Sequence, residues 1–280
     1  MKIEFFKMQA AGNDYIYVDA RKTYVPHPEK LARSASIRRF SIGSDGLVLI
    51  LPSNAADVKM RIFNADGSEG EICGNALRCV GKYVAETENK KELTVETKAG
   101  IKKLTPRFKG AKVTSVAVRM GKADFSPSSI PVLSDSAVIG RPYAIGEKTF
   151  FLTCVSIGNP HAVFIVDDLA GLDVERLGRI VENDVTFPKK TNVEFVRKTS
   201  AKRLRARVWE RGSGMTLSCG SGACAVAAAC AVNGLIAYDT PVVVTLDGGE
   251  MTVSVGKDLS LGLTGDCRFV YKGEYDYAEV

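Results

Sequence analysis

The chain has 280 residues, which is long for one compact core and comfortable for two domains of about 140 residues each. Apolar residues make up 45% of it and charged residues 25%, a composition that excludes a disordered or fibrous protein. The net charge of +6 is spread along the sequence, and the densest basic stretch, residues 202–207, alternates charged with small or apolar residues. This alternation is typical of the exposed face of a strand, so nucleic-acid binding is not expected.

No segment of the sequence indicates a membrane or secretory destination. The longest apolar run, Ala223–Val232, is about half as long as the ~20 residues that a membrane span needs. The N-terminus lacks the apolar stretch and the cleavage site of a signal peptide. We therefore expect a cytoplasmic protein whose seven cysteines, an odd number, are thiols rather than disulfides.

The two halves of the chain repeat one pattern. The pairs Cys73-Gly74 and Cys219-Gly220 are 146 residues apart. The motifs Gly12-Asn13-Asp14 and Gly158-Asn159-Pro160, each followed by a strand-like alternation, are separated by the same interval. Shorter matches at this interval pair residues 47–49 with 193–195 and residues 61–63 with 207–209. Several coincidences at one spacing predict a duplicated domain.

Each half is expected to contain short strands and one prominent helix. Runs rich in β-branched residues at 93–97 and 113–118 predict strands. A helix is expected just after each Cys-Gly pair, and the second one, over 223–232, is apolar all round, as in a fully buried helix. The first helix has an apolar stripe at helical spacing, formed by Leu77, Val80, Gly81 and Val84.

These elements predict an α+β fold of two pseudo-symmetric domains, each a mostly antiparallel sheet or barrel wrapped around a central helix. A parallel βαβ fold would need more long helices than the sequence offers. Turn-forming residues between 120 and 136 mark the boundary. The predicted domains are residues 1–119 and 120–267, and a C-terminal strand at 268–280 is expected to return to the first domain.

Cys73 and Cys219 each precede a glycine at the start of an expected helix. A helix N-terminus has unpaired N–H groups and a partial positive charge, which lower the pKa of a cysteine and bind an anion such as a carboxylate. If the two domains face each other, one thiol can remove a proton from a carbon next to a carboxylate and the other can return a proton on the opposite face. Simple packing of small cysteines at helix starts is the alternative, which their matching repeat positions disfavour.

The other cysteines have no repeat partner and are expected in the core: Cys79, Cys154, Cys224, Cys230 and Cys267. A zinc site is not expected, because the sequence has no Cys-x-x-Cys pair and only two histidines, His27 and His161. No other metal and no cofactor is expected.

Two long motifs surround the paired cysteines. The first contains Asn64-Ala65-Asp66-Gly67-Ser68, Cys73-Gly74-Asn75 and Arg78-Cys79, and the second runs from Glu210 to Ala225. Both resemble the active-site signatures of the diaminopimelate epimerase family. The motifs Gly12-Asn13-Asp14, Gly158-Asn159-Pro160-His161 and Thr191-Asn192-Val193-Glu194 occur in the family's order, and the resemblance covers nearly the whole chain.

The resemblance implies an isomerase that interconverts LL- and meso-2,6-diaminopimelate without pyridoxal phosphate, in lysine and peptidoglycan precursor biosynthesis. It implies that Cys73 and Cys219 are the acid and base, with His161 and Glu210 as further catalytic residues. The reacting carboxylate would be held at the helix starts by Gly74, Asn75, Gly220 and Ser221. The rest of the substrate would be bound by Asn13, Asn64, Asn159, Asn192, Glu210 and Arg211. A homodimer is also implied.

The chemistry of these residues agrees with that substrate. The carboxylate of its second amino-acid head needs a cation, and Arg211 can bind it through two parallel hydrogen bonds. The ammonium group of that head needs hydrogen-bond acceptors, which Glu210 and the asparagines supply. Turn formation is the alternative for Asn13 and Asn159, since both follow a glycine. A hydrogen-bonded surface or core residue is the alternative for His161.

Two other functions stay open at this point. One is a related isomerase: a proline-type racemase, a broader amino-acid racemase or a phenazine-pathway isomerase, of which the last usually lacks the cysteine pair. A proline racemase has no use for the neighbouring Glu210 and Arg211. The other is a thiol switch in which Cys73 and Cys219 form a reversible disulfide. For the enzyme, closure of the domains over the substrate is expected, because removing a weakly acidic proton needs a site that excludes water.

Overall fold

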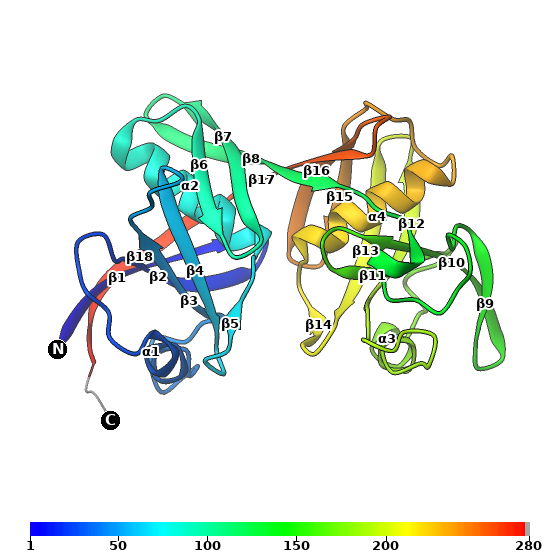
Figure 1. Ribbon diagram of the computed structural model, residues 1–280, viewed down its shortest axis with the longest axis horizontal. Helices are drawn as coiled ribbons and strands as arrows, with labels where there is room; N and C mark the ends of the chain where they lie inside the picture. The colour runs from blue at the N-terminus through cyan, green and yellow to red at the C-terminus, as the bar shows by residue number, and fades with distance from the viewer. Residues whose placement is uncertain (278–280) are drawn as a thin grey trace. The chain divides into compact units, whose positions relative to one another are not determined.

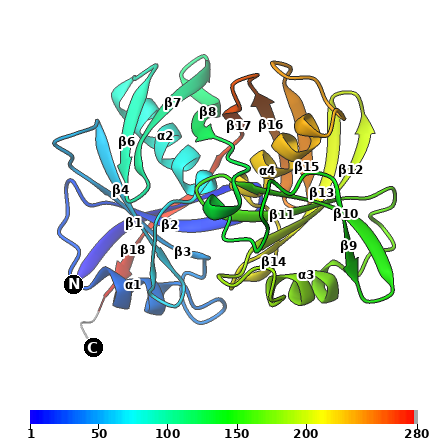
Figure 2. The same cartoon turned by 45° about the vertical axis from the view of Figure 1, so that its right-hand side comes forward.

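The computed structural model describes residues 1–277 (Figures 1 and 2). The chain forms two compact units: the first consists of Met1–Val118 and Gly265–Val280, and the second of Arg119–Thr264. Part of the strand expected at 268–280, namely residues 278–280, lies outside the described residues. No helix within residues 1–277 is long and apolar enough to cross a membrane.

The first unit is a mostly antiparallel sheet with two helices. Its strands are β1 (Lys2–Ala10), β2 (Asn13–Asp19), β3 (Gly46–Leu51), β4 (Val58–Asn64), β5 (Glu69–Gly70), β6 (Leu93–Thr97), β7 (Gly100–Lys109), β8 (Lys112–Lys122), which continues past the unit boundary, and β18 (Arg268–Asp276). Its helices are α1 (Pro28–Ala35) and α2 (Gly74–Glu88). β18 pairs antiparallel with β1, so the C-terminal strand belongs to the same sheet as the first strand.

The second unit repeats this arrangement. Its strands are β9 (Arg141–Ile145), β10 (Lys148–Ser156), β11 (Pro160–Ile165), β12 (Asn192–Ser200), β13 (Arg203–Glu210), β14 (Gly214–Thr216), β15 (Val242–Leu246), β16 (Gly249–Val255) and β17 (Ser260–Gly265), which ends at the unit boundary. Its helices are the short 3-10 helix η1 (Pro127–Ser129), α3 (Val174–Glu182) and α4 (Gly220–Val232).

Strand register confirms the repeat that the sequence predicts. In the first unit, β2 and β3 are parallel with Ile16 opposite Leu47, and β4 is antiparallel to β3. In the second unit, β11 and β12 are parallel with Ala162 opposite Val193, which are the residues 146 positions further on, and β13 is antiparallel to β12. Both parallel pairs are joined by a helix, α1 or α3, because parallel strands need a crossover connection. The predicted pseudo-symmetric α+β fold is therefore confirmed.

Each unit has a central helix that begins at the glycine of a Cys-Gly pair. α4 packs against β10, β11, β12, β13, β15 and β16, and its alanine-rich sequence is buried on all sides. α2 packs against β1, β2, β6 and β7 through its predicted apolar stripe (Figure 1). The five cysteines expected in the core are all buried. α4 is buried along nearly its whole length, and α2 is buried up to Ala85 while its last turn is exposed, so the N-terminal ends of both helices are held by packing.

The helices α1 and α3 are additions to the predicted elements. α3 has a recognisable start, since the side chain of Asp173 accepts a hydrogen bond from the Arg176 N–H at 3.1 Å. Its buried residues Val174, Leu177 and Val181 follow helical spacing. α1 begins with Pro28, a residue favoured in the first turn of a helix. Both signals are present in the sequence, but α1 and α3 are too short for their apolar periodicity to predict a helix by itself.

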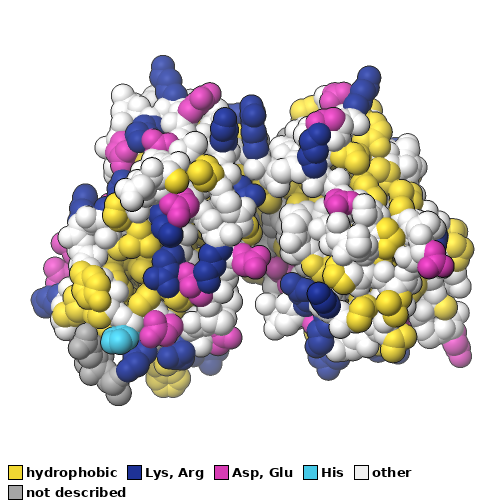
Figure 3. Space-filling view, viewed as in Figure 1, with side chains coloured by type: hydrophobic (Ala, Val, Ile, Leu, Met, Phe, Trp, Pro, Cys, Tyr) yellow, Lys and Arg dark blue, Asp and Glu magenta, His cyan; other side chains and the backbone are white. Residues whose placement is uncertain are grey.

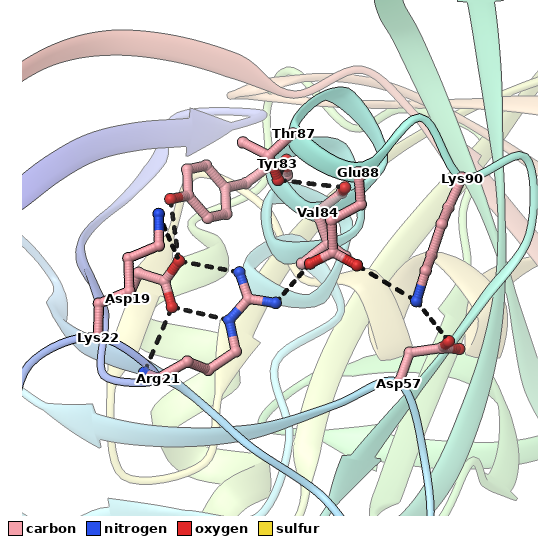
Figure 4. A network of polar contacts seen from close by, with 9 residues as sticks. All are labelled: Asp19, Arg21, Lys22, Asp57, Tyr83, Val84, Thr87, Glu88 and Lys90. Carbon is pink, nitrogen blue, oxygen red and sulfur yellow. Dashed lines mark hydrogen bonds and ion pairs between the residues drawn. The ribbon is translucent and has the colours of Figure 1, made fainter.

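A polar network anchors the end of α2 that lies away from Cys73 (Figure 4). Arg21 connects Asp19 at the end of β2, at 2.8 Å, with Glu88 at the end of α2, at 2.5 Å. Lys90 then connects Glu88 with Asp57, whose pKa is lowered to about 2, chiefly by its hydrogen bond to Lys90. The helix that follows Cys73 is therefore linked by charged groups to the end of β2 and to the residue before β4, in addition to the packing of its apolar stripe.

Residues 203–207 of the basic stretch lie on β13, with Leu204 and Ala206 buried and the arginines on either side of them more accessible. Arg203 pairs with Glu250 at 2.8 Å, and Arg207 pairs with Asp247 at 3.5 Å. On the face shown in Figure 3, Lys and Arg side chains are interspersed with Asp and Glu over both units. The arginines of this strand are thus paired with carboxylates of the neighbouring hairpin.

Gly178→Ala is expected to destabilise the second unit, although alanine is the better helix former. A Cβ at Gly178 would lie 2.5 Å from the Cβ of Trp209, so α3 or β13 would have to shift. Overpacking of this kind costs about 1–3 kcal/mol, which chemical denaturation followed by circular dichroism measures. Arg176→Ala, at an exposed position of the same helix, is the control; an equal effect of both changes would contradict the packing argument.

Candidate active site

Cys73 and Cys219 occupy the same local structure in the two units. Each is the residue that precedes the first turn of its helix, with φ and ψ of −133° and 118° at Cys73 and of −128° and 119° at Cys219. Each backbone carbonyl accepts the first helical hydrogen bond, from Leu77 or Ala223, at 2.9 Å. The cysteine side chains therefore leave the two helix starts in equivalent directions relative to their own helices.

The surroundings of the two thiols differ. Sγ of Cys219 is buried, accepts a hydrogen bond from the Gly222 N–H at 3.3 Å and lies 3.4 Å from Oγ of Ser221. The Cys73 thiol is partly exposed and donates to Oδ1 of Asn13 at 3.4 Å. The duplicated backbone thus holds two cysteines in unequal environments.

The expectation that the helix start lowers the cysteine pKa is wrong for Cys219. Burial raises the pKa of this thiol well above its usual value, and the nearby carboxylates of Glu210 and Glu194 raise it further. The hydrogen bonds from Ser221 and Gly222 lower the pKa, but by less. Cys219 therefore keeps its proton at neutral pH in the ligand-free protein.

Iodoacetamide at pH 8 is expected to alkylate Cys73 at least about ten times faster than Cys219. The thiolate is the nucleophile, and one unit of pKa changes its population tenfold, while burial adds a further obstacle at Cys219. Mass spectrometry of the peptides that contain each cysteine measures both rates, with the buried Cys230 as the unreactive reference. Equal rates, or faster reaction of Cys219, would contradict the conclusion that Cys219 keeps its proton at neutral pH.

A chain of hydrogen-bonded polar groups leads to Cys219. Nδ1 of His161 lies 2.7 Å from Oε1 of Glu194, and Nε2 lies 3.0 Å from Oδ1 of Asn159. Nδ2 of Asn159 donates to Oγ of Ser221 at 3.3 Å, and Ser221 contacts the Cys219 sulfur. His161 and Glu194 have no exposed side-chain surface, so this hydrogen-bonded pair is fully buried beside the helix start.

Glu194 is absent from the site residues expected from the sequence. It lies in the middle of β12, where the repeat places the apolar Val48 in β3. Its Oε2 has no hydrogen-bond partner among the described residues. A Cβ at Gly222 would lie 2.9 Å from Oε1 of Glu194, so only a glycine permits this carboxylate to approach the helix start. The sequence did contain a signal for Glu194: a charged residue stands there, whereas the equivalent repeat position in the first half, Val48, is apolar.

The turn after β13 carries Glu210 and Arg211. Oε1 of Glu210 accepts a hydrogen bond from Oγ1 of Thr216 at 2.6 Å, and burial raises the pKa of this carboxyl. The Arg211 N–H donates to Oδ1 of Asn192 at 2.9 Å, and the guanidinium donates to the carbonyl of Lys189 at 3.2 Å. Asn192 also donates to the carbonyl of Pro160 at 2.9 Å, so its amide joins β11 to the Arg211 turn.

In the first unit, Asn13 is oriented by Asp45, a second residue absent from the expected site. Nδ2 of Asn13 donates to Oδ2 of Asp45 at 2.6 Å, which leaves its Oδ1 facing the Cys73 thiol. Asp45 is paired in turn with Arg38 at 3.0 Å. Asn64 is exposed, and its amide donates to Oγ of Ser68 at 2.9 Å.

A buried cation lies beside the start of α2. Arg78 has no exposed surface, donates to Oδ1 of Asn75 at 2.8 Å and to the carbonyl of Gly74 at 3.3 Å. Its Nε has no partner within residues 1–277. The repeat places Cys224 at the equivalent position of α4. The first helix start therefore has a buried positive charge beside it, whereas the second has buried carboxylates.

The structure brings most of the expected site residues to these two helix starts within their own units. Those of the first unit are Asn13, Cys73, Gly74 and Asn75, with Asn64 at the end of β4. Those of the second unit are Asn159, His161, Glu210, Cys219, Gly220 and Ser221, with Asn192 and Arg211 joined to each other at the turn. Within residues 1–277, no three His, Cys, Asp or Glu side chains are grouped as metal ligands are.

Comparisons with known proteins agree with this arrangement. A family profile described as diaminopimelate epimerase matches residues 5–126 and 153–270. Diaminopimelate epimerase of Desulfovibrio desulfuricans is 46% identical over 283 residues, which cover 98% of each chain. That of Methanococcus maripaludis is 45% identical over 98% of this chain and 100% of its own length. The chain belongs to the diaminopimelate epimerase family.

Solved structures of more distant proteins share the fold. A phenazine biosynthesis protein of Bacillus anthracis superposes with a TM-score of 0.73 at 20% identity, covering 98% of this chain and 99% of its own. A hydroxyproline epimerase of Agrobacterium vitis superposes with a TM-score of 0.71 at 16% identity, covering 98% and 92%. At these identities the likeness shows the fold alone. The fold of two pseudo-symmetric units is therefore shared with these distant proteins.

Proposed function

We propose that this protein interconverts LL- and meso-2,6-diaminopimelate without a cofactor, as its family membership implies. The observation that carries the mechanism is the pair Cys73 and Cys219, which stand at matching helix starts of two duplicated units. A duplicated unit supplies the same chemical group twice, and a reaction that is nearly symmetric about one carbon needs the same group on each face.

In the proposed reaction, Cys73 and Cys219 lie on opposite faces of the substrate α-carbon. The thiolate of one cysteine takes the α-proton and becomes a thiol, while the electron pair remains on the carbon and its carboxylate. The thiol of the other cysteine then donates its proton to the opposite face and becomes a thiolate. The two cysteines exchange roles in the reverse direction. The backbone N–H groups at Gly74, Asn75, Gly220 and Ser221 stabilise the reacting carboxylate.

The unequal surroundings of the cysteines support a defined resting state. The raised pKa of Cys219 makes it the proton donor in the ligand-free enzyme. The Cys73 thiol is partly exposed, and the buried guanidinium of Arg78 is hydrogen-bonded to the two residues that follow it. Cys73 is therefore the resting base, and the isomer whose α-hydrogen faces it reacts without prior proton exchange between the cysteines.

The second amino-acid head of diaminopimelate determines the remaining assignments. Arg211 binds its carboxylate, and Glu210 with the asparagine oxygens accepts from the ammonium groups. His161 and Glu210 are further catalytic residues, which influence the protonation of the Cys219 sulfur. The asparagines proposed to contact substrate are Asn13, Asn64, Asn159 and Asn192. The two units are the proposed domains of the enzyme, and they close over the substrate. The homodimer, the cytoplasmic location and the role in lysine biosynthesis stay predictions.

Conversion of LL- to meso-diaminopimelate by the purified protein tests this function. We expect turnover with no added cofactor. Separation of the LL and meso isomers on a chiral column measures the conversion. An amino acid with one carboxylate, such as proline or alanine, is the comparison substrate and is expected to react far more slowly. Faster racemisation of the monocarboxylic amino acid would overturn the assignment of substrate, because Arg211 and Glu210 would then have no second head to bind.

A further inference from the structure

Glu182 is a buried carboxylate at the C-terminal end of α3. Its side chain is about as buried as its apolar neighbours in the core, with 5% of the residue exposed. The C-terminal end of a helix carries a partial negative charge, so an ionised glutamate there is unfavourable for the helix itself. The groups that bind this carboxylate must therefore offset the unfavourable free energy of placing it at the end of the helix. These groups lie outside α3.

The two oxygens of Glu182 bind both sides of the turn that carries Glu210 and Arg211. Oε2 accepts a hydrogen bond from Nε1 of Trp209 at 2.7 Å, and Oε1 accepts one from the Gly212 N–H at 3.0 Å. Trp209 immediately precedes Glu210, and Gly212, with φ of +76°, immediately follows Arg211. One carboxylate thus closes a loop around exactly these two residues.

Three further contacts fix the same turn. Nζ of Lys190 lies 3.8 Å from Oε1 of Glu182, which adds a positive charge to the cluster. The Arg211 N–H donates to Asn192, and its guanidinium donates to the carbonyl of Lys189, the residue before Lys190. Both the backbone and the guanidinium of Arg211 are therefore tied to the segment that Glu182 organises.

We propose that Glu182 is a positioning residue that sets the affinity for the second amino-acid head of the substrate by holding the Glu210-Arg211 turn. The inference rests on the proposed function, because it assigns to that turn the binding of a carboxylate and an ammonium group. Glu182 does not touch the substrate. It acts through Trp209 and Gly212, and its loss releases Arg211 while leaving Cys219 at the rigid start of α4.

Glu182→Gln separates this role from general stability. Glutamine keeps the size of the side chain and one acceptor oxygen, but its NH₂ group would face a donor, either the Trp209 indole or the Gly212 N–H. We expect KM for diaminopimelate to rise about tenfold, the effect of losing one hydrogen bond to a charged group, while kcat changes less than about threefold. Glu182→Ala removes both acceptors and is expected to raise KM further.

Trp209 is the only tryptophan of the chain, so its fluorescence reports directly on the contact. We expect the emission maximum to shift in Glu182→Gln, because a charged acceptor is lost at the indole nitrogen. Glu147→Gln, in the exposed turn between β9 and β10, is the matched control and is expected to leave KM, kcat and emission unchanged. Thermal unfolding of each variant shows whether it is folded at the assay temperature.

The outcomes separate this inference from the proposed function. Active wild-type protein with a raised KM and a shifted emission in Glu182→Gln supports the positioning role. Active wild-type protein and an unchanged KM in both folded Glu182 variants would overturn it and leave the proposed function intact. A fall in kcat with KM unchanged would also overturn it, since catalysis rather than substrate affinity would then depend on Glu182. Inactive wild-type protein would overturn the proposed function and this inference together.

Discussion

Replacing either Cys73 or Cys219 with alanine is expected to lower the rate of diaminopimelate epimerisation by at least about a thousandfold. A positioned acid or base contributes roughly 10²–10⁴-fold to a rate, and inversion at one carbon needs both groups. Each variant keeps one of these two cysteines, so each retains a group that could act on only one face. The measurement is the initial rate of conversion in both directions for each variant.

Cys230→Ala is the matched control for the cysteine variants. Cys230 lies in the same helix as Cys219, is buried and has no proposed role in the reaction. We expect it to retain wild-type kcat with a small loss of stability from the missing sulfur. Full activity in Cys73→Ala or in Cys219→Ala would rule out the two-base scheme, whatever the behaviour of the control.

Arg211→Ala is expected to lower kcat/KM for diaminopimelate by about 100-fold or more. Removing one partner of a hydrogen-bonded charge pair costs about 2–5 kcal/mol, and the carboxylate of the second amino-acid head would lose its cation. The loss is expected mainly in KM, since Arg211 lies away from the reacting carbon in the proposed complex. Arg211→Lys restores the charge without the planar fork and is expected to recover only part of the loss.

Arg203→Ala is the control for Arg211, since it removes an exposed arginine from the start of β13, the strand that precedes Arg211. It is expected to leave kcat/KM within about twofold, because exposed ion pairs contribute little to stability. If Arg211→Ala also left kcat/KM unchanged, the second head would have to be bound elsewhere. The substrate assignment would then lose its main structural support.

The duplicated architecture was predictable from the sequence because it depends on spacing. The interval between Cys73 and Cys219 recurs in the strand register, and the apolar run of α4 identifies a buried helix without knowledge of its neighbours. Residues in the same short motif also lie together, as Ser221 does with Cys219. Local sequence is sufficient wherever the partners are neighbours along the chain.

The missing parts of the site are those in which residues distant in sequence supply the charge. Glu194 reaches Cys219 from β12, Asp45 orients Asn13 from the end of a loop, and Glu182 holds the Arg211 turn from α3. The pKa of Cys219 was mispredicted for the same reason. A helix start alone lowers a cysteine pKa, but burial and two carboxylates from other segments reverse the direction here.

Solvent deuterium labelling tests the two-base claim most directly. In heavy water the thiol hydrogens exchange with solvent, so a proton donated by a cysteine is replaced by deuterium. Starting from LL-diaminopimelate and stopping at low conversion, we predict that the meso product carries deuterium at the inverted α-carbon while the recovered LL substrate does not. Product that retained the original α-hydrogen would show that one group both removes and returns the proton, and would contradict the account.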